Sequence, residues 1–436
     1  MNVLVVGGGG REHALIRKIK ESERVSNVYC CPGNGGISYD AQCFPVSATD
    51  IPGVVELAKN LPAVYHGEDG AFVYVEVAAP DDPLVAGMVD ALNAEGFATF
   101  GPNAAAAIIE GSKVFSKNLM LKYNIPTAEY KVFDNPCDVL TYIKEKNEFP
   151  AVIKADGLAL GKGVIIPENL EEAEKGVHEI MEDKIFGESG NHVVVEEFLT
   201  GPEVSVLAFT DGKCVKPMVS SMDHKRALDG DKGLNTGGMG TVSPNPYYTA
   251  DIAKECMEKI FLPTIDAMNK EGRTFKGCLY FGLMLTPKGP KVIEYNCRFG
   301  DPETQVVLPR LKTDIIDIFE AINSGTLAEL DIEWADEACA CVIAASGGYP
   351  KSYPKGIEIT GLENGQKDGV IVYHAGTAIK DGKLVTSGGR VLGVTALGSD
   401  LQQALDKAYS ALDEIHFDNM HFRHDIGKKA LAALNK

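Results

Sequence analysis

The sequence predicts a multidomain protein of the α/β and α+β classes, and three changes of pattern along the chain carry this prediction. The first hundred residues alternate short apolar strands with helical periods, which is typical of a parallel, doubly wound, Rossmann-like sheet. From Pro150 the strands flank closely spaced glycines, and after Ser324 the chain becomes β-rich. We therefore expect a Rossmann-like domain, a second domain with a mobile flap, and a small β-rich domain.

The individual elements follow from apolar periodicity. In the first part, strands are expected at 3–6, 28–31 and 72–79, and helices at 12–20, 54–59 and 104–109. Strands at 151–154 and 164–166 should pair antiparallel around the flap, followed by strands at 192–196 and 203–209. A long polar loop is expected at 221–246, a helix at 250–270, and a hairpin of strands 278–285 and 291–296. The last part should hold strands 340–345, 370–374 and 390–396 and an amphipathic helix at 401–415.

Composition narrows the class of function. The 436 residues include 42 Lys+Arg and 61 Asp+Glu, a formal net charge of −19, with 45% hydrophobic residues. The apolar fraction excludes an intrinsically disordered chain. The negative net charge argues against a protein that coats nucleic acid non-specifically. It does not exclude a small phosphorylated ligand, which needs only a local positive pocket. No basic, apolar leader and no membrane-length apolar run is evident, and the cysteines are scattered. We expect a cytoplasmic protein with free thiols.

A first glycine loop, Gly7 to His13, follows a strand and opens a helix. It lacks the dinucleotide fingerprint, because Glu12 or His13 stands where the third glycine would be and no acid ends the second strand. NAD binding is therefore not predicted. A helix N-terminus beside Arg11 could bind a phosphate, and the alternative is a tight turn without a ligand.

A second glycine-rich segment runs from Lys154 to Val164. It is not a Walker A loop, because three residues separate Gly157 from Gly161 and no Ser or Thr follows Lys162. Lys154 stands at a strand end, where its ammonium could contact nucleotide phosphates, and the glycines allow the backbone to fold over them. The alternative is a flexible hairpin with solvated lysines.

A third segment contains Glu294, Asn296 and Arg298. Residues two apart on a strand point to one face, so a carboxylate and an amide oxygen could together hold Mg²⁺. Arg298 could stabilise the charge of a phosphoryl or acyl-phosphate group. The alternative is a glutamate paired with arginine for structure alone.

These motifs recur in order with several others along the whole chain. They are Gly9 to Ala14, Pro32 to Gly36, Glu110 to Lys113, Ile153 to Gly163, Asp223 to Arg226, Asn235 to Gly240, Glu294 to Thr304, Gly347 to Pro350, His374 to Thr377 and Gly388 to Val391. The sequence thereby resembles the ATP-grasp superfamily and, within it, the glycinamide ribonucleotide synthetase family. The resemblance implies a pre-grasp domain at 1–102, an ATP-grasp domain at 103–325 with a mobile lid at about 124–192, and a C-terminal domain at 326–436.

The activity implied by the resemblance joins glycine to 5-phospho-β-D-ribosylamine. ATP is the co-substrate and is converted to ADP and phosphate through a glycyl phosphate, in purine biosynthesis. The resemblance also implies Mg²⁺, or Mn²⁺ in its place, as cofactor. We expect small-molecule substrates, a monomer in transient contact with the upstream amidotransferase, no nucleic-acid or membrane partner, and no fused downstream activity.

The resemblance also assigns the site residues. Contacts to ATP fall to Lys113, Lys154, Gly161, Lys162, Gly163, the hinge from Glu196 to Leu199, and Glu203 for the ribose. Glu294 and Asn296 would hold the metal and Arg298 the acyl phosphate, while Asp223 or His224 would take the amine proton. The remaining substrate contacts are Gly10, Arg11, Asn34, Lys225, Arg226, Asn235, Thr236, Gly237, Gly238, Asp301 and Glu303.

Two other functions were weighed. Another ATP-grasp ligase, using formate or bicarbonate, would lack the motifs at 223–226 and 235–240. A nucleotide-binding regulatory module would have lost the residues that this chain retains at 154, 294, 296 and 298. Residues 60–77 do not align with the family, and His416, His421 and His424 are predicted to be solvated surface residues instead of metal ligands.

Overall fold

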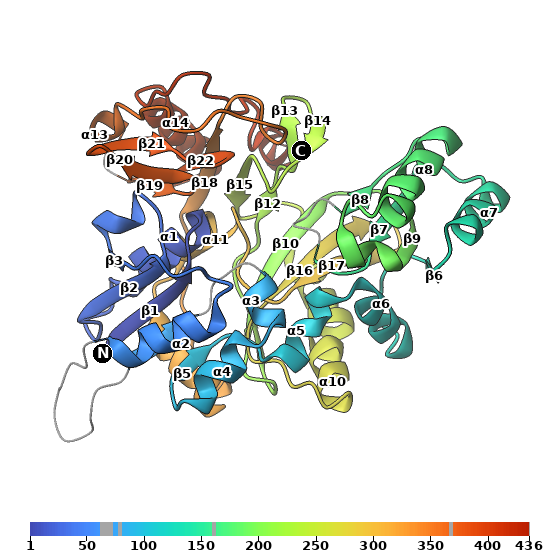
Figure 1. The fold of residues 1–436 in the computed structure, drawn as a ribbon, viewed down its shortest axis with the longest axis horizontal. Helices are drawn as coiled ribbons and strands as arrows, with labels where there is room; N and C mark the ends of the chain where they lie inside the picture. The colour runs from blue at the N-terminus through green and yellow to red at the C-terminus, as the bar shows by residue number, and fades with distance from the viewer. Residues whose placement is uncertain (62–72, 77–80, 159–162, 366–368, 436) are drawn as a thin grey trace.

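The computed structural model describes residues 1–61, 73–76, 81–158, 163–365 and 369–435 (Figure 1). The first part is a five-stranded sheet in the order β3 (Gln42–Cys43), β2 (Asn27–Pro32), β1 (Asn2–Gly7), β4 (Val73–Glu76) and β5 (Ala98–Phe100). Its helices are α1 (Gly10–Ile19), α2 (Ile51–Asn60), α3 (Asp81–Val85) and α4 (Met88–Ala94). All neighbouring strands are parallel, as predicted.

The central part is built on a four-stranded sheet. Its order is β11 (Val215–Pro217), β10 (Glu203–Thr210), β16 (Gly277–Thr286) and β17 (Gly289–Asn296). The accompanying helices are α5 (Ala104–Gly111), α6 (Lys113–Lys122), α9 (Ala250–Cys256) and α10 (Leu262–Lys270), with a π-helical turn at Met257–Phe261 between the last two. The predicted helix at 250–270 is thus one continuous helix, and the rings of Phe261 and Phe281, 4.3 Å apart, pack it against the sheet.

A smaller α/β unit projects from the body of the molecule (Figure 1). Its sheet has the order β6 (Tyr130–Phe133), β9 (Val193–Glu197), β7 (Ala151–Ala155) and β8 (Val164–Ile165), with helices α7 (Pro136–Lys146) and α8 (Leu170–Val177). The unit has its own core, which includes Val139, Ile153 and Val195. Strands β7 and β8 are antiparallel, as predicted for the arms of the flap.

The last sheet combines segments that are far apart in the sequence. Its order is β12 (Met222–Asp223), β15 (Gly240–Ser243), β18 (Ala338–Ala345), β22 (Arg390–Gly398) and β19 (Val370–His374). Two hairpins lie outside it: β13 (Arg226–Leu228) with β14 (Lys232–Asn235), and β20 (Thr377–Lys380) with β21 (Lys383–Thr386). The remaining helices are α11 (Thr304–Val307), α12 (Ile315–Ser324), α13 (Leu362–Gly365), α14 (Leu401–Leu412) and α15 (Lys428–Leu434).

The prediction of a polar loop at 221–246 was wrong, because this stretch contains β12, β13, β14 and β15. These strands are too short for a visible alternation of apolar and polar residues. Strand β15 is nevertheless buried throughout, because it pairs with β18 from Gly240↔Val342 to Ser243↔Cys339. Helix α15 was not predicted either, since its seven residues offer less than two turns of pattern.

The first and last sheets are held together by buried polar contacts. The backbone N–H of His374 on β19 donates to Nδ1 of His13 on α1 at 2.8 Å. Asn34 donates to the carbonyls of Gly8 at 3.0 Å and His374 at 2.9 Å. Figure 1 accordingly places α1 and α11 beside β19 and β22. Within the described ranges, no helix is long and apolar enough to cross a bilayer.

Candidate active site

A β-bulge on β17 sets the direction of Glu294 and Asn296. Gly282 on β16 faces Glu294 and Leu283 faces Val292, so Ile293 is the extra residue. Before the bulge the even-numbered position Val292 is buried, whereas after it Tyr295 is buried and both Glu294 and Asn296 are half-buried. The extra residue therefore turns the carboxylate and the amide to one open face of the sheet.

Positive charges surround Glu294. Nζ of Lys225 lies 3.5 Å from Oε1 of Glu294 and 3.7 Å from Oε2 of Glu203 at the start of β10. The charge of Lys225, helped by Lys154 and Lys113, lowers the pKa of Glu294 despite the opposing effect of burial. In turn, the Glu294 carboxylate raises the pKa of Lys225 well above its usual value.

Lys154 is the last but one residue of β7 and reaches from the projecting unit to the central sheet. Its Nζ is 3.0 Å from Oε1 of Glu196 on β9 and donates to the carbonyl of Ile293 at 3.1 Å. Lys117 on α6 lies 2.9 Å from the other oxygen of Glu196, and burial lowers the pKa of Lys117 to about 8. Lys117 was missed, although it follows Lys113 by four residues and so shares its helix face.

The remaining ATP-contact candidates that the structure describes near β7 and β9 are Lys113, Leu199 and Gly163. Nζ of Lys113 donates to the carbonyl of Gly157 at 2.7 Å, and burial lowers the pKa of Lys113. Leu199 is half-buried just after β9, and Gly163 directly precedes β8. Gly161 and Lys162 lie outside the described residues.

Arg298 is held by a glutamate that lies outside its own sequence motif. Its Nη2 lies 3.0 Å from Oε1 of the buried Glu110 at the end of α5, and Oε2 of Glu110 accepts the backbone N–H of Cys297 at 2.6 Å. Arg298 also contributes to the lowered pKa of Glu294. Its guanidinium therefore lies near the face that carries Glu294, with its orientation fixed by Glu110 on α5.

Asp223 and Glu303 form the acidic side of the site. Burial, and then repulsion from Glu303, raises the pKa of Asp223 well above its usual value. Ser205 and Tyr280 donate hydroxyl hydrogen bonds to Glu303 at 3.1 and 3.2 Å. Gly238, at φ +111°, fits closely beside them: a Cβ atom there would lie 2.6 Å from Oδ1 of Asp223.

His224 does not face the substrate space with a free ring nitrogen. Its Nδ1 donates to the carbonyl of Gly240 at 3.1 Å, and its Nε2 accepts the backbone N–H of Gly427 at the same distance. Burial, and then the charge of Arg423, lowers the pKa of His224 to about 4. The imidazole is therefore neutral and is used to join two backbone segments.

Arg390 on β22 is a functional candidate that was not singled out from its motif. Its Nη1 donates to the carbonyls of Gly237 at 2.6 Å and Asp301 at 2.9 Å, and its Nη2 lies 3.1 Å from Oδ2 of Asp301. Burial would raise the pKa of Asp301, but Arg390 and Arg11 outweigh it and lower that pKa. The repeated glycines before Arg390 were the available signal.

Helix α1 begins close to Gln305, because a Cβ atom at Gly10 would lie 2.7 Å from Nε2 of that residue. Arg11 contacts Glu12 at 2.6 Å and the carbonyl of Phe299 at 3.0 Å. The amide group of Asn34 is occupied by backbone groups on both sides, as its oxygen accepts the N–H groups of Gly36 and Ile37.

The loop that follows Asp223 supplies backbone contacts to the site. Thr236 donates through its hydroxyl to the carbonyl of Lys225 at 2.8 Å. Arg226 donates to the carbonyl of Gly233 at 2.8 Å and pairs with Asn235 across the hairpin. Arg226 and Asn235 are therefore engaged within the hairpin, whereas Lys225 reaches the group around Glu294.

Three family models match the chain in order. Residues 1–110 match the N domain of phosphoribosylglycinamide synthetase, residues 111–304 its ATP-grasp (A) domain, and residues 339–429 its C domain.

Full-length relatives agree with these matches. The chain is 48% identical to the phosphoribosylamine–glycine ligase of Caldanaerobacter subterraneus subsp. tengcongensis, over 98% of this chain and 99% of the relative. It is also 47% identical to the trifunctional purine biosynthetic protein adenosine-3 of Gallus gallus. That match covers the whole of this chain and 43% of the relative. The crystal structure of phosphoribosylamine–glycine ligase from Thermotoga maritima superposes with a TM-score of 0.82 at 33% identity, over 98% of this chain and all of that one. The chain thus belongs to the phosphoribosylglycinamide synthetase family.

Proposed function

We propose that the protein is an ATP-dependent ligase that joins the carboxyl group of glycine to the amine of 5-phospho-β-D-ribosylamine, releasing ADP and phosphate and forming glycinamide ribonucleotide. The observation that supports it best is the arrangement around Glu294, where Lys113, Lys154, Lys225 and Arg298 all contribute to the carboxylate's lowered pKa. Such a concentration of cations over hard oxygen ligands suits the transfer of a phosphoryl group between anions.

We assign ATP binding to the boundary between the projecting unit and the central sheet. Lys154 and Lys113 would contact the phosphates, the segment from Glu196 to Leu199 the adenine, and Glu203 the ribose hydroxyls. In support, Lys154, which pairs with Glu196 inside the projecting unit, also reaches the carbonyl of Ile293 on β17 of the central sheet. Gly161, Lys162 and Gly163 would complete the set of residues that bind ATP.

The oxygen ligands present suit Mg²⁺, with Mn²⁺ as a substitute. Glu294 and Asn296 share an open face and are half-buried, which leaves room for the phosphate oxygens and waters that Mg²⁺ also requires. No group of three or more His, Cys, Asp or Glu suited to a metal occurs among the residues that the structure describes. When bound, the ion would neutralise phosphate charge and orient the γ-phosphoryl group.

The first step transfers the γ-phosphoryl group to a carboxylate oxygen of glycine. The bond from the γ-phosphorus to the bridging oxygen breaks, ADP leaves, and glycyl phosphate forms. Lys225 would bind the glycine carboxylate or its phosphate, and Arg298, oriented by Glu110, would stabilise the acyl phosphate. Both cations hold anions together that would otherwise repel each other.

In the second step the ribosylamine nitrogen attacks the acyl carbon, and phosphate leaves. Of the two candidates for the amine proton, Asp223 suits the role, because burial and then Glu303 raise its pKa and so make the carboxylate more basic than an ordinary aspartate. His224 has both nitrogens engaged, so we assign it a positioning role. Thr236, Gly237, Gly238, Asp301 and Glu303 would line the acceptor, with Arg390 as an added contact.

The phosphate of the ribosylamine would be bound at the start of α1, where Gly10 and Arg11 lie against the turn of Asp301 and Gln305. Asn34 would hold this corner together instead of touching the phosphate. We further propose a cytoplasmic monomer in transient contact with the amidotransferase that supplies the ribosylamine, and domain limits at 1–102, 103–325 and 326–436, with the lid at about 124–192.

The test is ADP release measured with glycine and ribosylamine omitted in turn, the ribosylamine being formed in the assay from ribose 5-phosphate and ammonia. Full turnover should need both substrates, and the product should be the glycinamide. Glu294→Ala should abolish product formation while the far-UV circular dichroism spectrum stays unchanged. Turnover with bicarbonate or formate in place of glycine would refute the assignment, and unchanged turnover in Glu294→Ala would refute its metal role.

A further inference from the structure

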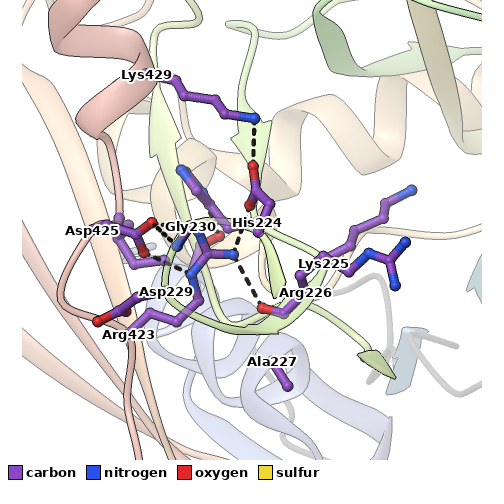
Figure 2. Close-up of polar contacts among 12 residues, drawn as sticks. His224, Lys225, Arg226, Ala227, Asp229, Gly230, Arg423, Asp425 and Lys429 are labelled. Atoms are coloured by element: carbon purple, nitrogen blue, oxygen red, sulfur yellow. Dashed lines mark hydrogen bonds and ion pairs between the residues drawn. The ribbon is translucent and has the colours of Figure 1, made fainter. Parts of the chain in front are cut away.

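Residues 421–429, which we name the C-terminal clamp, contact the loop of residues 224–231. This loop begins directly after Asp223 and carries Lys225 and the first strand of the hairpin β13–β14. Figure 2 shows the side chain of Arg423 from the clamp lying among Asp425, Gly230 and the backbone of Arg226, while the side chains of Lys225 and Arg226 point away from it.

Arg423 is the centre of this contact. It is 1% exposed and is the largest of the fully buried side chains. Its Nε and Nη2 bind the two oxygens of Asp425 at 2.8 and 3.0 Å, and its Nη1 binds Oδ1 of Asp231 at 2.9 Å and the carbonyl of Arg226 at 3.1 Å. Asp425 in turn accepts the backbone N–H of Gly230 at 2.8 Å. One guanidinium therefore binds two points of the loop directly, at Arg226 and Asp231, and a third, Gly230, through Asp425.

Four further residues of the clamp contact the loop. Nε2 of His421 is 2.7 Å from the carbonyl of Ala227, and His424 binds both oxygens of Asp229, at 2.8 Å through its backbone and 3.1 Å through its ring. Lys429 pairs with Asp231 at the outer edge. The backbone N–H of Gly427 donates to His224, as described above. Two of the three histidines predicted to be solvated thus bind the loop.

The hairpin has little else to hold it in place. Strands β13 and β14 pair only at Arg226↔Asn235 and Leu228↔Lys232, with an irregularity between them, and β14 is exposed at all four positions. Leu228 and Leu234 are 49% and 50% exposed, so the hairpin has no apolar anchor at these positions. A short exposed ladder of this kind is weak by itself. The clamp therefore supplies the constraint.

We infer that Arg423 is a positioning residue of the ligase reaction, acting through the loop that follows Asp223 and carries Lys225; this inference rests on the proposed function. The carbonyl of Lys225 accepts the backbone N–H and the hydroxyl of Thr236, and its ammonium faces Glu203 and Glu294. Displacing the loop would move these groups together. The ATP-binding residues Lys113, Lys154 and Glu196 lie on other elements and would stay in place.

The experiment compares Arg423→Met and Arg423→Lys with the wild-type enzyme. We measure kcat, the KM for glycine and for ribosylamine, and the Kd for ATP by equilibrium binding, after confirming by circular dichroism melting that each variant is folded at the assay temperature. Arg423→Met should raise the KM for one or both acceptor-side substrates by about 10-fold and lower kcat, with a Kd for ATP changed less than about 2-fold, given the loss of a buried charge-assisted contact. Arg423→Lys keeps the charge without the planar guanidinium, so its kcat and KM values should lie between those of the wild type and those of Arg423→Met.

The matched control is Lys429→Met, which removes the outer partner of the same Asp231. Lys429 is 70% exposed, and Asp231 keeps Arg423, so the control should retain wild-type KM values. A merely structural role would lower the active fraction, and hence kcat, without changing KM. Unchanged KM values in folded Arg423→Met, or an equal loss of ATP affinity, would overturn the inference. Absence of ligase activity in the wild type would instead refute the proposed function.

Discussion

The pair of Lys225 and Glu294 allows the electrostatics of the site to be tested directly. Two unit charges about 4 Å apart attract by ~4 kcal/mol at an effective dielectric constant of ~20 and by ~1 kcal/mol in water. The Glu294 side chain is 38% exposed and the two atoms are 3.5 Å apart, so water screens much of the attraction. We take the lower end, about 1 to 2 kcal/mol, and one pKa unit corresponds to about 1.4 kcal/mol. Lys225→Met should therefore raise the pKa of Glu294 by about one unit.

The measurement is a carboxyl ¹³C NMR titration of the ligand-free protein, with Glu294→Gln used to assign the resonance. In the wild type, Lys225 favours the charged carboxylate, so Glu294 stays ionised to a lower pH than in the variant. Lys291→Met is the matched control: Lys291 stands on the same strand but pairs with Glu197, so the pKa of Glu294 should not change. A titration of Glu294 in Lys225→Met that coincides with the wild type would refute the reasoning.

Three other substitutions test separate parts of the structure. Lys154→Met should weaken ATP binding by about 10- to 100-fold in a calorimetric titration, because a charged hydrogen bond contributes about 1.5 to 3 kcal/mol; tight binding would contradict its role. Gly238→Ala should lower kcat/KM for ribosylamine by about 10-fold, since strain of about 1 to 3 kcal/mol at φ +111° and the contact with Asp223 must be relieved. Gly272→Ala, at φ +70° with nothing within 4 Å of the added Cβ, is its control and should keep wild-type kinetics. Phe319→Ala should reduce the free energy of unfolding by about 3 to 5 kcal/mol in urea, because its ring is fully buried and lies 4.2 Å from that of Phe100; a loss below about 1 kcal/mol would show that the surrounding core collapses into the space.

Much of the fold could be predicted because long apolar runs have a visible period. Strand β1, buried at all six positions, and the continuous helix from Ala250 to Lys270 are of this kind. Strands β12 and β15 could not be predicted, because they are short and are stabilised by pairing: β15 pairs with β18, about a hundred residues further along the chain, and β12 pairs with β15. Local pattern contains no information about such a partner.

The same limit applies to the candidate site. The sequence predicts that Glu294 and Asn296 share a face, since residues two apart on a strand do so. It does not predict the bulge at Ile293, which determines that this face is the open one. The partner of Arg298 is Glu110 on α5, and Glu196 binds Lys117 as well as Lys154. Residue types follow from motifs, whereas the choice of partner depends on tertiary contacts.

The distribution of these groups over the fold separates the two halves of the proposed reaction. Lys154 and Glu196 belong to the projecting unit, which has its own core, whereas Asp223 lies in the sheet of β15, β18 and β22. Strand β17 stands between them, and Lys154 touches it only through its side chain, at the carbonyl of Ile293. A hydrogen bond from a charged donor contributes about 1.5 to 3 kcal/mol, which is small beside the packing of either core. The lysine proposed to bind phosphate and the aspartate of the acceptor side are therefore carried by different cores, and Glu294 on β17 is the point at which both halves of the proposed reaction meet.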